Sequence, residues 1–405
     1  MSSVAINAAW LLLAQIGGLL IPLIELPILA RALGQQGYGE IMYALGIAMT
    51  AAVFVEFGFS FSAARRVVGA NGDRAALGQL VADVLCAKLM LSAAVGVVIA
   101  AIMLFGTGAT ALPSHWFIWI AMFTVAFGFS PIWYYFGTEK LMLPAMLDFG
   151  LRGTGLLLVI LTVSTPQHTE RVLLIQASIG VLNTLVPTLA MLRQTGIGRF
   201  EVGGGWRVLR ESWDLFLYKG AQAVMGSVAS TMLGGLGGAR AVGTFVPAEK
   251  LVRAATGLAG PLLNAAFPHL VRMQSTSQSE AKKSVGIWLI ALALATVAFA
   301  ATTTVLAPWV VHLAFGPGYT DAVPLLRMLV WIVPMRVCSM AVGILWFIPT
   351  GREQLASRVM IMNIGVICLL ALWLVPTLGA IGMAAAFFCA EAMSCVALAY
   401  FFAKK

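Results

Sequence analysis

The chain has few charged residues: only 10% of its 405 residues are Asp, Glu, Lys or Arg, whereas 60% are hydrophobic. A soluble globular protein has about 25% charged residues. The shortage of charge therefore excludes a soluble enzyme, a disordered protein and a nucleic-acid binder. The net charge of +9 does not indicate DNA or RNA, because basic residues of a membrane protein gather in the loops of one side.

Groups that carry catalysis or bind metals are also scarce. The four histidines are scattered, and the five cysteines lie in apolar runs without paired spacing. The sequence contains no GxxxxGK[ST], HExxH or GxSxG motif. It therefore predicts no metal, no bound cofactor and no enzymatic activity. A transporter without an ATP site must draw energy from a proton or sodium gradient, or from the gradient of its own substrate.

Long apolar runs, in contrast, recur along the whole chain. A helix that crosses a bilayer needs about 20 mostly apolar residues. The runs predict an all-α integral membrane protein with twelve spans, at 9–31, 41–62, 80–104, 116–137, 142–163, 172–192, 213–235, 242–267, 285–306, 324–348, 359–375 and 381–402. The first run has no basic segment before it and no cleavage site, so we expect it to be a span and not a signal peptide.

The basic residues outside the spans indicate the orientation. With the N-terminus inside, most of them fall in cytoplasmic loops, and only Arg31, Arg171 and Arg240 fall in outside loops. This bias follows the positive-inside rule. It predicts a multi-pass protein of the bacterial inner membrane with both termini in the cytoplasm.

The longest segment between spans lies midway along the chain. It predicts a six-helix lobe at 1–192, a cytoplasmic linker at 193–212 and a second six-helix lobe at 213–405. The two halves echo each other weakly, because Leu33-Gly34 at the first hairpin recurs as Leu236-Gly237 at the seventh. Such duplication is typical of transporters, whose substrate sites lie at the interface of the repeats.

Ionisable residues inside the spans are the candidate site residues, because a charge within a membrane is costly and by default functional. Four basic residues, Arg152, Lys250, Arg253 and Arg336, are predicted to bind substrate. Most of the deep charges are basic, which favours an anionic ligand such as a phosphate or diphosphate. Three acids, Glu25, Asp83 and Glu391, are candidates for ion coupling or for gating pairs.

Each candidate has a structural alternative. Arg152 lies four residues after Asp148, and Arg253 lies four residues after Glu249, so both arginines could pair within their own helices. Arg336 has no acid within one turn and must pair across helices or with ligand. Asp83 and Lys88 lie near a helix end, where snorkelling towards water or a structural ion pair is the simpler explanation.

Several stretches in a fixed order resemble one family of exporters. They are PLIELPILARALGQQGYGEIMYAL from Pro22, FVEFGFSFSAARRV from Phe54, SPIWYYFGTEKL from Ser130, VGTFVPAEKLVRAATGLAGPLLNAAFPHL from Val242 and LWLVPTLGAIGMAAAFFCAE from Leu372. Over essentially its whole length the chain resembles the O-antigen flippases (Wzx type) of the multidrug, oligosaccharidyl-lipid and polysaccharide exporter superfamily (MOP superfamily).

The resemblance implies a MATE/MOP-like fold, with two pseudo-symmetric bundles of six helices around a central cavity. It further implies a flippase that moves an undecaprenyl-pyrophosphate-linked oligosaccharide, an O-antigen or related repeat unit, from the cytoplasmic to the periplasmic leaflet by alternating access. Its partners would be membrane lipids and the polysaccharide polymerase and assembly proteins, with no nucleic acid. The alternatives are a cation-coupled multidrug exporter of the same fold and, less favoured because no large outside loop is present, a polymerase or glycosyltransferase.

Overall fold

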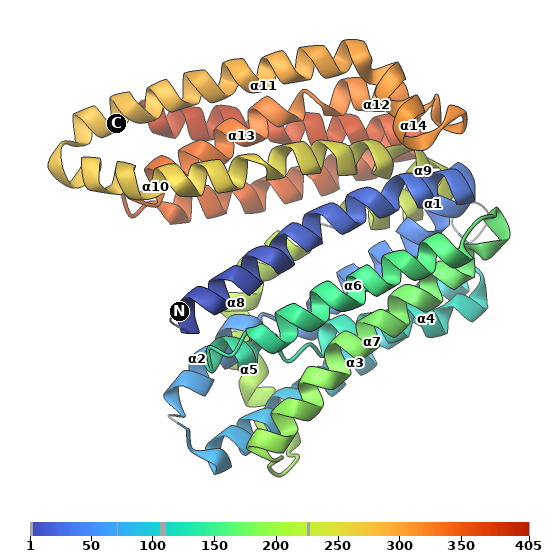
Figure 1. Ribbon diagram of the computed structural model, residues 1–405, viewed down its shortest axis with the longest axis vertical. Coiled ribbons are helices and arrows are strands. Elements are labelled where there is room, and N and C mark those ends of the chain that lie inside the picture. The colour runs from blue at the N-terminus through green and yellow to red at the C-terminus, as the bar shows by residue number, and fades with distance from the viewer. Residues whose placement is uncertain (1–2, 71, 106–110, 225–226, 405) are drawn as a thin grey trace. The chain divides into compact units, whose positions relative to one another are not determined.

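The computed structural model describes residues 3–70, 72–105, 111–224 and 227–404, and the regular elements within these ranges are all helical (Figure 1). Eight helical segments among the described residues are long and apolar enough to cross a membrane. Two of these, Leu20–Gly69 and Gln354–Ala403, are 50 residues long and therefore exceed one crossing of about 20 residues. The predicted fold class, an all-α integral membrane protein, is confirmed.

The chain divides into two compact units, Met1–Thr231 and Met232–Lys405. The segment expected to link two lobes, residues 193–212, is helical from Val202, where helix α8 (Val202–Val224) begins. Helix α8 packs on α3 (Arg74–Phe105) and so belongs to the first unit.

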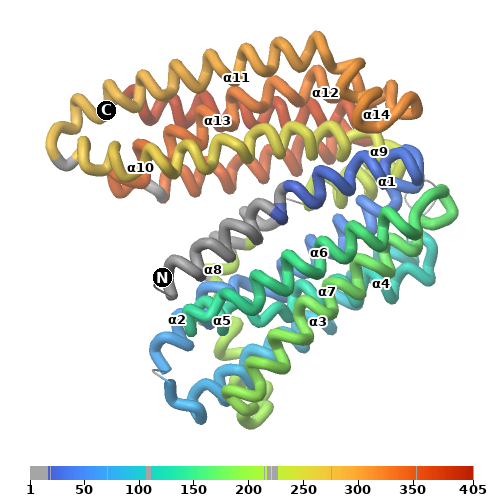
Figure 2. The backbone as a smooth tube through the Cα atoms, in the orientation of Figure 1, coloured from blue at the N-terminus to red at the C-terminus, as the bar shows by residue number. Residues whose placement is uncertain are grey.

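The first unit is built around the long helix α1 (Ser3–Glu56), which packs against α4 (Phe117–Gly128) and α6 (Met142–Thr162). Helix α7 (Thr169–Thr195) packs against α4 and α6. The short helices α2 (Phe59–Gly69) and α5 (Ile132–Gly137) contact each other. The tube in Figure 2 follows the backbone of these helices. Short 3₁₀ turns at Ser114–Trp116 and Pro166–His168 precede α4 and α7.

The second unit begins within α9 (Val228–Gly257) and continues through α10 (Ala259–Thr276) and α11 (Gln278–Phe315). After a 3₁₀ turn at Pro317–Tyr319 follow α12 (Ala322–Leu329), α13 (Ile332–Val342), a π-helical turn at Gly343–Phe347 and α14 (Glu353–Ala403). Helix α13 packs against both α11 and α14, which places it inside the unit.

Three glycines turn long helices back on themselves. Gly34 in α1, Gly238 in α9 and Gly379 in α14 have φ angles of 67°, 81° and 56°, a left-handed conformation that glycine adopts most readily. Each of α1 and α14 is therefore two membrane-length helices joined by one residue, as the predicted spans 9–31 with 41–62 and 359–375 with 381–402 require. In the seventh hairpin the turning residue is Gly238, which directly follows the Leu236-Gly237 pair that repeats Leu33-Gly34.

The end of α1 is stabilised by the side chain of Glu56. The backbone turns at Phe57 and Gly58, whose φ angles are 50° and 73°. The Glu56 carboxylate then accepts hydrogen bonds from the backbone N–H groups of Gly58, at 2.9 Å, and Ser60, at 2.6 Å. It thereby satisfies donors that the start of α2 leaves without partners in the helix.

We expect Glu56→Ala to destabilise the first unit, because the charged acceptor of these hydrogen bonds is lost. Hydrogen bonds to charged groups contribute about 2 kcal/mol. Glu40→Ala, on the same helix, is the control, since among the described residues Glu40 accepts only from Gln36, one turn away, and such pairs contribute about 0.5 kcal/mol or less. The thermal unfolding midpoint should fall clearly for Glu56→Ala alone, and equal midpoints for the two variants would contradict the capping role.

Candidate functional site: ion pairs within the membrane

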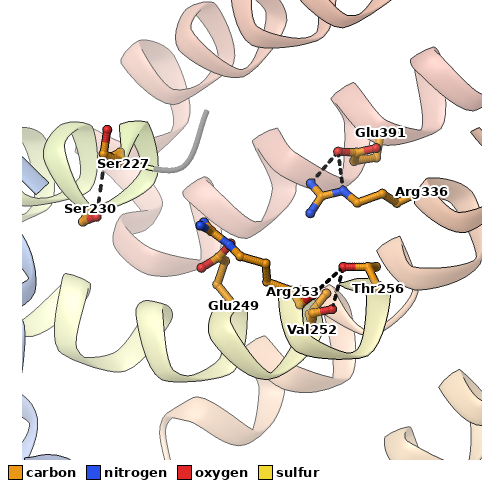
Figure 3. A network of polar contacts seen from close by, with 8 residues as sticks. All are labelled: Ser227, Ser230, Glu249, Val252, Arg253, Thr256, Arg336 and Glu391. Atoms are coloured by element: carbon orange, nitrogen blue, oxygen red, sulfur yellow. Dashed lines mark hydrogen bonds and ion pairs between the residues drawn. The ribbon is translucent and has the colours of Figure 1, made fainter. Parts of the chain in front are cut away.

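Arg336 on α13 pairs with Glu391 on α14 (Figure 3). The Arg336 Nε donates to Glu391 Oε1 at 2.9 Å, and the Arg336 Nη2 donates to the same oxygen. The side chain of Glu391 is only 5% exposed and that of Arg336 is 21% exposed. The sequence shows no acid within one turn of Arg336, and its partner Glu391 comes from another helix. Glu391 was itself predicted as a candidate for a gating pair.

Arg253 and Glu249 form a second pair, one turn apart on α9 (Figure 3). Arg253 donates from Nε at 2.9 Å and from Nη2 at 2.6 Å to Glu249 Oε1. Glu249 is buried, whereas the Arg253 side chain is 45% exposed. Lys250 follows Glu249 in the chain and is half-buried.

A third pair, Arg152 with Asp148, lies on α6 in the first unit. Arg152 Nε donates to Asp148 Oδ2 at 2.8 Å, and Asn183 Nδ2, from α7, donates to Asp148 Oδ1 at 2.9 Å. The intrahelical alternatives for Arg152 and Arg253 are thus confirmed as ion pairs. The side chains of both arginines are partly exposed.

The remaining two acids lie apart from these pairs, in the first unit. Glu25 lies between Pro22 and Pro27 on α1, and its Oε1 accepts from Gln176 Nε2 of α7 at 2.8 Å. Asp83, on α3, is 8% exposed and accepts from Gln79 Nε2 at 2.8 Å. A methyl group added to Gly204 of α8 would meet the Asp83 Oδ1 at 2.2 Å, so this carboxylate packs directly on the backbone of α8.

Lys88 is a buried cation whose environment the sequence did not reveal. It is 1% exposed, its Nζ donates to the backbone oxygen of Ser130 at 3.1 Å, and the ammonium lies 5.8 Å from the centre of the Phe59 ring. Snorkelling towards water is therefore the wrong explanation for Lys88. A single lysine in an apolar run gives no signal of which helices will surround it.

The ion pairs change the charge balance expected from the sequence. Each of the three deep arginines has a carboxylate partner within its own unit. Two of these partners, Asp148 and Glu249, were not counted among the deep acids. The positive charge of each deep arginine is therefore offset by the negative charge of its partner. An anion that binds one of these arginines meets a guanidinium group that already contacts a carboxylate.

Two sequence comparisons bear on the identity of the chain. Residues 4–274 match the family model described as polysaccharide biosynthesis protein. A protein of Shigella dysenteriae named "Putative O-antigen transporter" is 25% identical over 381 residues, which cover 93% of this chain and 94% of that protein.

Solved structures share the fold. The lipid II flippase MurJ in an inward closed conformation superposes with a TM-score of 0.68 at 11% identity, over 98% of this chain and 87% of MurJ. An inward-facing multidrug resistance MATE family transporter of the MOP superfamily superposes with a TM-score of 0.57 at 18% identity, over 95% of this chain and 94% of that protein. The predicted MATE/MOP-like fold is confirmed.

Proposed function

Because the chain belongs to the polysaccharide biosynthesis protein family, we propose that it is a lipid-linked oligosaccharide flippase. It moves an undecaprenyl-pyrophosphate-linked repeat unit, such as that of an O-antigen, from the cytoplasmic to the periplasmic leaflet. The observation that carries the proposal is the family match over residues 4–274, together with a relative named as an O-antigen transporter that aligns along nearly the whole chain. The membrane is the bacterial inner membrane, with both termini in the cytoplasm.

The deep arginines of the second unit supply the contacts for the diphosphate. Guanidinium groups bind phosphate oxygens through two parallel hydrogen bonds, which makes arginine the preferred residue for such ligands. Arg336 places Nε and Nη2 on one oxygen of Glu391, and within the described residues its Nη1 makes no hydrogen bond. A diphosphate therefore begins to bind at Nη1 and then competes with Glu391 for the rest of the guanidinium. Lys250 and Arg253, on α9 of the same unit as Arg336, are the other basic residues proposed to hold the diphosphate.

Competition between ligand and acid offers a way to couple substrate binding to a conformational change. The diphosphate takes the Arg336 guanidinium from Glu391, and release of the diphosphate restores the ion pair. Glu391, which loses its partner while the substrate is bound, is the first candidate for the coupling ion. A ligand shifts a conformational equilibrium only by its difference in affinity for the two states, and this exchange of partners supplies such a difference. Glu25 is the second candidate for the coupling ion, and Asp83 holds α8 against α3.

The lipid and protein partners follow from the chemistry of the substrate. The polyprenyl chain is apolar and remains in the bilayer while the diphosphate and sugars cross. The protein breaks no bond of the substrate and acts as a transporter. On the periplasmic side the repeat unit passes to a polysaccharide polymerase and its assembly proteins.

A cation-coupled multidrug exporter of the same fold is the second candidate. The observation that favours it is the charge balance of the ion pairs, because deep arginines whose charges are offset by acids do not repel a cationic drug. Glu25, half-buried on the proline-containing part of α1, would then be the central carboxylate.

The test of the flippase is the leaflet accessibility of a short undecaprenyl-pyrophosphate-linked glycan in proteoliposomes. A glycosidase that cannot cross the bilayer is added outside the vesicles. About half of the glycan molecules start in the outer leaflet, so cleavage of more than this half reports flipping. We expect cleavage to continue towards completion in vesicles that contain the protein and to stop near half in empty vesicles. Equal cleavage in both preparations, for several different glycans, would refute the flippase proposal.

A further inference from the structure

The first unit contains a cavity of about 290 Å³ between α4, α5, α6 and α7. Its lining combines the aromatic rings of Phe127 and Phe136 with the polar side chains of Asp148, Arg152 and Asn183. The volume lies at the small end of ligand pockets, which span about 300–1,000 Å³. It suits one small molecule and excludes a whole oligosaccharide.

The polar side chains of the cavity present both donors and acceptors. Asp148 is fixed by two hydrogen bonds, from Arg152 Nε at 2.8 Å and from Asn183 Nδ2 at 2.9 Å. Within the described part of the chain, the terminal nitrogens of Arg152 and the amide oxygen of Asn183 make no hydrogen bond. These atoms are held in place by the Asp148 contacts and are available to a ligand.

The charge and polarity of the lining select the class of ligand. A purely apolar ligand, such as part of a polyprenyl chain, would leave these polar groups without partners in an apolar surrounding, which is unfavourable. The Asp148 carboxylate beside Arg152 opposes a free anion, and Arg152 opposes a cation. A neutral polyol fits instead, because each hydroxyl can accept from Arg152 and donate to Asp148 or Asn183. Its C–H face can lie on the phenylalanine rings, as in apolar ligand pockets with a few polar groups.

We propose that this cavity is a saccharide subsite, which binds one neutral monosaccharide residue. That the sugar belongs to the transported repeat unit rests on the proposed function. The subsite lets the first unit recognise the identity of a sugar. Transport then depends on which sugar the glycan presents to the cavity.

The experiment measures binding without transport. Saturation-transfer NMR is recorded on the full-length protein in nanodiscs with methyl glycopyranosides of glucose, galactose, mannose and N-acetylglucosamine, and with farnesol as an apolar probe. At least one glycoside should receive saturation from the protein. We expect its signal to fall at least fivefold in Asn183→Leu, and also in Phe136→Ala, which removes part of the aromatic wall from an exposed position. Thr188→Leu is the matched control, because Thr188 lies on the same helix as Asn183 and outside the cavity lining.

Each outcome bears on the subsite independently of the flippase. No glycoside signal, a glycoside signal that survives both cavity variants, or a farnesol signal that Asn183→Leu and Phe136→Ala abolish would overturn the saccharide subsite. Flipping of a lipid-linked glycan by a protein that gives no glycoside signal would leave the flippase intact and refute only the subsite. Glycoside binding in a protein that does not flip would refute only the flippase.

Discussion

Arg336→Ala is expected to lower the rate of glycan flipping in proteoliposomes by about 100-fold. Removal of one partner of a buried charge pair between a protein and its ligand costs about 3 kcal/mol of binding free energy, and each 1.4 kcal/mol is a factor of 10. The loss is expected because the substitution removes the guanidinium that is proposed to contact the diphosphate. Arg327→Ala serves as the control, since Arg327 is an exposed arginine of the same unit that donates to the backbone oxygen of Thr304.

The double variant Arg336→Ala/Glu391→Ala separates binding from stability. Arg336→Ala alone leaves the buried Glu391 carboxylate without its partner and should lower the unfolding midpoint. Removing Glu391 as well relieves this unpaired charge, so the double variant should regain much of its stability. If Arg336 binds substrate, the double variant stays inactive. Recovery of transport together with stability would show that Arg336 only neutralises Glu391.

Gly382→Ala is expected to destabilise the second unit by about 2 kcal/mol or more, because small-to-large changes in packed sites cost about 1–3 kcal/mol. Gly382 follows the turn at Gly379, and a Cβ atom there would lie 2.4 Å from the backbone oxygen of Leu374, which precedes the turn. Backbone atoms cannot rotate away as a side chain can. The thermal unfolding midpoint of the purified protein in detergent measures the effect.

Gly365→Ala on the same helix is the matched control. Nothing lies within 4 Å of an added Cβ at Gly365, and alanine is favoured over glycine inside a helix by about 1 kcal/mol. This variant should therefore match or exceed the stability of the unchanged protein. Equal unfolding temperatures for Gly382→Ala and Gly365→Ala would refute the close approach of Gly382 to the backbone of Leu374.

The membrane helices could be predicted from composition alone, because a bilayer demands long apolar segments. The predicted span 142–163 corresponds to α6 at Met142–Thr162, and the span 172–192 lies within α7 at Thr169–Thr195. Short breaks within a helix could not be predicted from the apolar pattern. The break after Glu56 depends on a left-handed Phe57 and on hydrogen bonds to one carboxylate, and neither changes the apolar pattern of the run.

The ion pairs divide into those that spacing predicts and those that it does not. A separation of four residues brings Asp148 to Arg152 and Glu249 to Arg253 on one helix face. Glu391 lies 55 residues after Arg336, and only the packing of α13 on α14 brings the two together. The sequence overstated the positive charge of the site because it counted the deep arginines without all of their acidic partners.

The most direct measurement of the central claim compares two cargoes in one set of proteoliposomes. Outer-leaflet exposure of an undecaprenyl-pyrophosphate-linked glycan and movement of a cationic dye are followed in parallel, with and without a proton gradient. The flippase account predicts protein-dependent exposure of the glycan, accelerated by the gradient, and no movement of the dye above that in empty vesicles. Gradient-driven movement of the dye without exposure of the glycan would contradict it and identify a multidrug exporter.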